Sequence, residues 1–73
     1  SKYVAIENKI ETLVTAKGIN NCLAVINDDG TKVDVIVDVK DLSDNVIIQI
    51  KEIAMEQLNC SFEDITIIQS NNS

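Results

Sequence analysis

The sequence predicts a single α+β domain, a two-layer sandwich in which two helices cover one face of a three-stranded sheet. Three observations lead to this fold class, with the chain order helix, strand, strand, helix, strand. Apolar residues recur at steps of three and four in two segments, which is typical of amphipathic helices. A β-branched segment alternates apolar and polar residues, which is typical of a strand. The length of 73 residues suits one small domain.

The first helix is expected over residues 3–17. Gly18 follows it, and glycine can adopt the left-handed conformation that ends a helix without steric cost. The apolar residues line one face of this helix: Tyr3, Ile6, Ile10, Leu13 and Val14. The polar residues are expected to face solvent on the other side: Glu7, Asn8, Lys9, Glu11, Thr12 and Thr15.

Two strands are expected next, over residues 22–27 and 32–39. The second strand alternates clearly, because a valine recurs at every other position from Val33 to Val39. The residues between the strands begin with Asn27 and include Gly30, a composition that favours a tight turn. The two strands are therefore predicted to form a hairpin.

Two registers of this hairpin fit the sequence. A turn that pairs Asn27 with Thr31 is preferred, and it places Leu23 and Val25 on the same face as the core valines of the second strand. A two-residue turn at Asp29–Gly30 is the alternative. Because a shift of one residue turns every side chain to the other face, the alternative buries the even-numbered residues of the first strand instead: Cys22, Ala24 and Ile26.

A second helix is expected over residues 44–58 and a third strand over residues 64–69. Ser43 is suited to cap the start of this helix, and Asn59 is suited to end it in a left-handed conformation. Cys60 is expected to pack inward just after that end. The third strand can lie beside the first strand, antiparallel to it, or beside the second, parallel to it through a right-handed crossover. Either arrangement leaves one face of the sheet uncovered.

The composition argues against an enzyme, a metal site and a nucleic-acid-binding protein. Histidine and arginine are absent, which removes the commonest general base and metal ligand and the usual phosphate-binding group. The net charge of −6 has the wrong sign for attracting nucleic acid or anionic lipid. The two cysteines, Cys22 and Cys60, are too few to hold structural zinc, and we interpret them as small buried apolar residues. We therefore expect no catalytic residue, no cofactor and no metal.

Apolar residues outside the expected core predict a contact surface. Ile48 and Met55 lie seven residues apart on the second helix, and they share that side with Lys51. In the preferred hairpin register, Ile26 and Ile36 point away from the helices. Two lines of exposed apolar residues on so small a domain favour a protein interface. The candidate interface is therefore Ile26, Ile36, Ile48, Lys51 and Met55.

Five segments of the sequence resemble one family of sporulation proteins. They are IETLVTAKGI (10–19), CLAVIND (22–28), KVDVIV (32–37), Leu42–Ser43 and EDITII (63–68). In this order they are similar to the C-terminal domain of the stage III sporulation protein AH family of endospore formers. The similarity covers nearly the whole chain, and it consists of a helix that ends in Lys-Gly, a hairpin and a capped helix.

The resemblance implies a ring-building motif, related to the YscJ/FliF-type domains of type III secretion systems and flagella. It implies a non-enzymatic structural domain of a mother-cell protein, membrane-anchored through a transmembrane helix N-terminal to this segment. The domain would lie in the space between mother cell and forespore, next to the mother-cell-derived outer forespore membrane, after forespore engulfment. There it would bind stage II sporulation protein Q of the forespore and build a channel complex. A homo-oligomeric ring, with the helices of one copy stacked on the sheet of the next, is also implied.

A different class of function fits the same fold, namely a small ligand-binding or regulatory α+β domain that dimerises through its open sheet face. No apolar run is long enough to span a bilayer. Because the chain begins at Ser1 rather than Met and carries no signal-peptide pattern, we expect residues 1–73 to be a fragment of a longer protein. A single transmembrane helix encoded upstream would favour the structural interaction domain over the ligand-binding domain.

Overall fold

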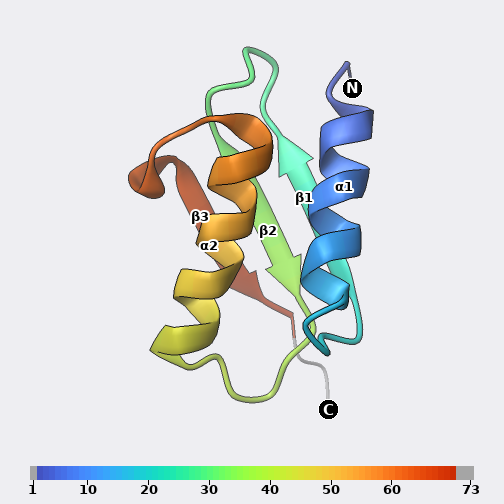
Figure 1. Ribbon diagram of the computed structural model, residues 1–73, viewed down its shortest axis with the longest axis vertical. Helices are drawn as coiled ribbons and strands as arrows, with labels where there is room; N and C mark the ends of the chain where they lie inside the picture. Colours follow the sequence, from blue (N-terminus) through green and yellow to red (C-terminus); the bar gives the residue numbers. More distant parts are fainter. Residues whose placement is uncertain (1, 71–73) are drawn as a thin grey trace.

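The computed structural model describes residues 2–70 of the chain. Two helices lie on one side of a three-stranded sheet and form a second layer (Figure 1). The predicted α+β fold class and the order of its elements are confirmed. The elements are α1 (Val4–Thr15), β1 (Cys22–Ile26), β2 (Val33–Val37), α2 (Asp44–Leu58), a short 3-10 helix η1 (Phe62–Asp64) and β3 (Ile65–Gln69).

Both predicted caps of α2 are present. The hydroxyl of Ser43 accepts a hydrogen bond from the backbone N–H of Val46 at 3.2 Å. Asn59 adopts the left-handed conformation, with a φ of 60°. In η1, the carboxylate of Asp64 accepts a hydrogen bond from the backbone N–H of Ser61 at 3.0 Å. These local bonds fix where α2 ends and where β3 begins.

The hairpin adopts the alternative register, so the preferred pairing of Asn27 with Thr31 is wrong. The backbone N–H of Asn27 donates instead to the carbonyl of Lys32, at 3.1 Å. The cause is the Asn27 side chain, whose Oδ1 accepts hydrogen bonds from the N–H groups of Thr31 and Lys32, at 3.0 and 2.9 Å. The loop therefore holds one residue more than the preferred turn, and it is closed by a bond from the N–H of Gly30 to the carbonyl of Asn27.

This register decides which residues of β1 reach the core. Ala24 lies opposite Val35 and Ile26 lies opposite Val33, and both β1 residues are buried. Ile26 is only 5% exposed, so its prediction as an outward-facing interface residue is wrong. Leu23 takes its place on the other face of the sheet and is 54% exposed.

The sheet order is β1-β2-β3, so the third strand lies beside the second. β2 pairs with β1 in an antiparallel manner and with β3 in a parallel manner. The parallel pairing is possible because α2 carries the chain back across one face of the sheet before β3 begins (Figure 1). Of the two positions that the sequence leaves open for the third strand, the structure therefore has the parallel one.

The core lies between this sheet and the two helices. α1 packs mainly on β1, α2 packs on β3, and the helices contact each other. Cys60 is only partly buried, although the sequence predicts it inside. The buried apolar residues are Ile10, Val14, Ile19, Ala24, Ile26, Val33, Val35, Val37, Ile50, Ala54 and Ile65.

Candidate interaction surfaces

The structure gathers no cluster of side chains of the kind that binds a metal ion, as far as residues 2–70 are concerned. Within residues 2–70, no group of three or more His, Cys, Asp or Glu side chains is placed to hold a metal ion. Neither α1 nor α2 has the length and apolar character that a bilayer-spanning helix requires.

Both cysteines are free thiols that resist ionisation. Burial, and then the negative charge of Glu11, raise the pKa of Cys22 to about 11. Burial, and then the charge of Asp64, raise the pKa of Cys60 above its ordinary value. Since the thiolate is the reactive form, neither sulfur is a good nucleophile at neutral pH.

An apolar row crosses the open face of the sheet, on the side away from the helices. Leu23 of β1 lies opposite Ile36 of β2, and Ile36 lies beside Ile68 of β3. Leu23 is 54% exposed, Ile68 is 41% exposed, and Ile36 between them is partly buried. Val25, also exposed, extends the apolar surface next to Asp34. All three strands therefore contribute to one apolar surface, which we call the open-face row: Leu23, Ile36 and Ile68.

The structure keeps only part of the predicted line along α2 at the surface. Ile48 is 46% exposed, as a contact residue should be. Lys51 turns towards η1, where its Nζ lies 4.1 Å from the centre of the Phe62 ring and donates a hydrogen bond to the Phe62 carbonyl at 3.3 Å. Met55 packs against the core. The interface role of Ile36, Ile48, Lys51 and Met55 stays a prediction.

Sequence reasoning misses several apolar surface residues, among them Leu23, Ile68 and Phe62. Leu23 and Ile68 depend on the hairpin register and on the position of β3, which the sequence leaves open. Phe62 is 43% exposed in η1, and it follows Ser61, a residue suited to cap a helical turn.

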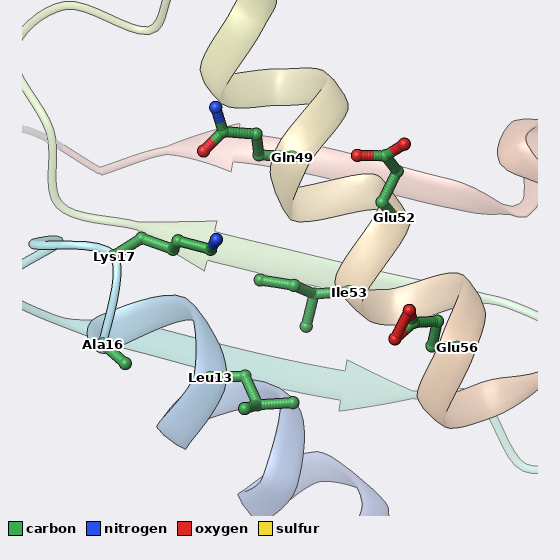
Figure 2. Close-up of a pocket in the computed structure, with 7 residues that line it drawn as sticks. All are labelled: Leu13, Ala16, Lys17, Gln49, Glu52, Ile53 and Glu56. Atoms are coloured by element: carbon green, nitrogen blue, oxygen red, sulfur yellow. The ribbon is translucent and has the colours of Figure 1, made fainter.

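A shallow groove runs between the two helices on the outer side of the helix layer (Figure 2). Leu13 of α1 and Ile53 of α2 point into it from opposite sides. Lys17, Glu52 and Glu56 supply charges at its rim. An apolar floor with charges of both signs at the rim suits contact with another protein surface. Ala16 and Gln49 complete the lining.

Comparisons with known proteins show the family from the sequence and the fold from solved structures. The sequence model of a family described as SpoIIIAH-like protein matches residues 1–67. A comparison with curated proteins finds no match. Among solved structures, the type III secretion system protein EscJ of enteropathogenic E. coli is similar, with a TM-score of 0.77 and 22% identity over 96% of this chain. A chain of the SpoIIQ–SpoIIIAH pore-forming complex is similar with a TM-score of 0.77 and 18% identity over 97% of this chain.

These structural similarities bear on the fold. At 22% and 18% identity, TM-scores of 0.77 show that the backbone arrangement is shared. This chain spans 47% of the EscJ chain and 59% of the chain in the complex. The α+β arrangement of two helices on a three-stranded sheet is thus common to all three.

Proposed function

Because this chain belongs to the SpoIIIAH-like protein family, we propose that it is a non-enzymatic interaction domain of a sporulation channel complex. Its partner is a SpoIIQ protein of the forespore, and further copies of the chain join it in a ring. The domain lies in the space between mother cell and forespore, and it is held there by a membrane anchor outside residues 1–73. Its task in that space is to make contacts.

The open-face row is the observation that carries this proposal. Leu23, Ile36 and Ile68 lie side by side on three neighbouring strands. Because neighbouring strands are about 4.8 Å apart, the row is a continuous apolar strip about 10 Å across. Covering an exposed aliphatic side chain completely is worth about 1.5–3 kcal/mol. A partner that covers this strip therefore gains a substantial free energy.

The similar structures support two parts of the proposal, namely SpoIIQ as the partner and assembly into a larger complex. One of them is a complex of SpoIIQ with SpoIIIAH that is described as pore-forming, which supports SpoIIQ as the partner. The other, EscJ, belongs to a type III secretion system. A ring built by head-to-tail contacts needs two different surfaces on each subunit. The open-face row and the groove between α1 and α2 lie on opposite sides of this domain, so the groove stays open to a further subunit when a SpoIIQ protein covers the row.

Replacing the central residue of the row tests the proposal. Ile36→Thr keeps a β-branched side chain, and so the strand preference, but removes apolar area from the row. We expect the affinity for the soluble part of a SpoIIQ protein to fall at least about fivefold, or about 1 kcal/mol. Val4→Thr is the control, because it makes the same kind of β-branched apolar-to-Thr change at an exposed residue, 47% exposed, at the start of α1.

The same measurements separate this proposal from the alternative function. Calorimetry reports SpoIIQ binding, and sedimentation velocity reports whether the chain alone dimerises. A chain that ignores SpoIIQ but forms a dimer that Ile36→Thr weakens would be a regulatory or ligand-binding domain that dimerises through its open face. Equal SpoIIQ affinity of the Ile36→Thr and Val4→Thr variants would remove the open-face row from the partner interface.

A further inference from the structure

β1 is an edge strand, and three of its five backbone N–H groups point away from the sheet. The backbone N–H of Asn27, just after β1, donates to the carbonyl of Lys32, just before β2, and therefore points towards β2. Because N–H groups alternate in direction along a strand, those of Cys22, Ala24 and Ile26 point to the free edge. An edge with unpaired N–H groups is a template for another strand.

Two carboxylates of α1 occupy two of these three N–H groups, those of Ala24 and Ile26. The Oε2 atom of Glu11 accepts a hydrogen bond from the N–H of Ala24 at 2.9 Å. The Oε2 atom of Glu7 accepts one from the N–H of Ile26 at 2.7 Å. Both glutamates are partly buried, although the sequence places them on the solvent side of the helix. Hydrogen bonds to an ionised acceptor are roughly twice as strong as those between neutral groups.

The spacing of the two glutamates matches the spacing of the strand. Residues four apart on a helix are separated by about 6 Å along its axis. Residues two apart on an antiparallel strand are separated by about 6.8 Å. A helix that lies along a strand, as α1 lies along β1 (Figure 1), can therefore reach every second N–H with side chains at i and i+4.

The sequence of β1 gives a reason for such protection. The strand reads Cys-Leu-Ala-Val-Ile and carries no charge, proline or bulge of its own. Charged residues on an edge strand are the usual means of preventing edge-to-edge pairing. A short, uncharged, apolar strand is also the kind of segment that pairs with identical segments of other copies.

The other edge of the sheet lacks this protection. Ser70 donates to the carbonyl of Val37 at 2.8 Å, so by alternation the N–H groups of Ile67 and Gln69 point away from β2. Within residues 2–70, no side chain accepts a hydrogen bond from either of these two N–H groups. The two edges therefore differ in whether a helix covers their donors with carboxylates.

We propose that Glu7 and Glu11 form an edge cap that prevents a second copy of this chain from adding its own β1 to this edge of the sheet. The cap occupies the N–H groups of Ala24 and Ile26, and its two negative charges repel the equivalent pair on an approaching copy. Strand-to-strand association is thereby excluded at β1, whichever partner covers the open face.

Hydrogen exchange on the unaltered chain is the first test. The Ala24 and Ile26 amides should exchange at least about tenfold more slowly than those of Ile67 and Gln69, after correction for intrinsic rates. All four amides lie on strand edges, so the difference measures the cap. Equal protection of the two pairs would overturn the proposal.

The double variant Glu7→Ala/Glu11→Ala is the second test. At low protein concentration, the Ala24 and Ile26 amides should lose at least about tenfold in protection. At high concentration, their protection should return together with a rise in sedimentation mass, because a second β1 now occupies the edge. Glu7→Gln/Glu11→Gln is the control, since each amide oxygen can still accept the bond, and it should stay protected at both concentrations.

Two outcomes of the variant experiment contradict the cap. If the double alanine variant loses protection but keeps the mass of the unaltered chain at every concentration, the glutamates only dock α1 on β1. If the double variant fails to fold, Glu11→Ala alone takes its place, and its loss of protection should be confined to Ala24. A loss of hydrogen-exchange protection that spreads evenly over β1 would mean that Glu11 has only a general structural role.

Discussion

The thiol of Cys22 is partly buried at the start of β1, where the negative charge of Glu11 acts on it. Burial and this charge both disfavour the thiolate, and together they raise the pKa to about 11. In the unfolded chain, the same thiol ionises near its ordinary value. Folding is therefore linked to the proton on this sulfur.

This linkage predicts a loss of stability at alkaline pH. Between about pH 9 and pH 11, the unfolded chain releases the Cys22 proton while the folded chain retains it, so the free energy of unfolding falls as pH rises. Cys22→Ala should flatten this part of the profile, measured by urea unfolding at a series of pH values. An unchanged slope in the variant would assign the alkaline loss to other groups.

The raised pKa values and partial burial of the two cysteines also predict how they react with thiol reagents at neutral pH. Because the Cys22 and Cys60 thiols are protonated and partly buried, both should react slowly with alkylating reagents in the folded domain. Unfolding removes the burial of both and the charges that act on them.

At the scale of single elements, α2 contains core and surface within one turn. Ile50 is 1% exposed and lies in the core, whereas Ile48, two residues earlier, is 46% exposed. Ile50→Asp buries a charge without a partner, which should unfold a domain whose total stability is about 5–15 kcal/mol. Ile48→Asp should change the free energy of unfolding by no more than about 0.5 kcal/mol while weakening partner binding or self-assembly. Thermal unfolding and a binding titration on both variants check this contrast.

The result for Met55 should differ from that for Ile48. Met55 packs against the core, so Met55→Asp should lower the stability as well as any binding. If Ile48→Asp proves as destabilising as Ile50→Asp, then the side of α2 that carries Ile48 belongs to the core.

The elements also show which local patterns suffice to predict structure. α2 matches its expected bounds because Ser43 and Asn59 carry the chemistry of its two ends, within a residue of the helix itself. β1 is located correctly, but its orientation is not predictable from alternation, because all five of its residues are apolar. A strand that is apolar on both faces contains no periodic signal for register. The hydrogen bonds of the Asn27 side chain decide the register instead.

For the whole molecule, the layer arrangement follows from the sequence, whereas the surfaces follow from tertiary pairing. Two amphipathic helices and three strands leave one sheet face open in either strand order, so the fold class is predictable. The open-face row cannot be predicted from the sequence, because it joins Leu23, Ile36 and Ile68 across strands that pair only in the folded state. Of the predicted interface, Ile36 and Ile48 lie at or near the surface and Ile26 does not.

The edge cap escapes prediction for a related reason. Periodicity assigns a residue to the apolar or the polar side of a helix, and Glu7 and Glu11 are polar. Their partners are backbone N–H groups 19 and 13 residues away in the chain. Backbone donors carry no side-chain signature in the sequence, so only the packing of α1 along β1 reveals them.

The open-face row predicts how the whole domain meets its partner. Leu23 and Ile68 lie on the two opposite edge strands, with Ile36 of the central strand between them. A partner that covers the face contacts both ends of the row, so Leu23→Asp and Ile68→Asp should each weaken SpoIIQ binding at least about tenfold, or about 1.4 kcal/mol. Both side chains are exposed, at 54% and 41%, so the free energy of unfolding should stay within about 0.5 kcal/mol of the unaltered value.

The pattern over the two variants distinguishes face contact from edge contact. A partner strand that adds to the edge of β3 would lie beside Ile68 and two strands away from Leu23. In that case Ile68→Asp would weaken binding and Leu23→Asp would not. Calorimetric titration of both variants, with Val4→Asp as a control from the helix layer, separates the cases. Because the edge cap closes the β1 side, the reverse pattern, a loss for Leu23→Asp alone, would contradict both the face contact and the cap.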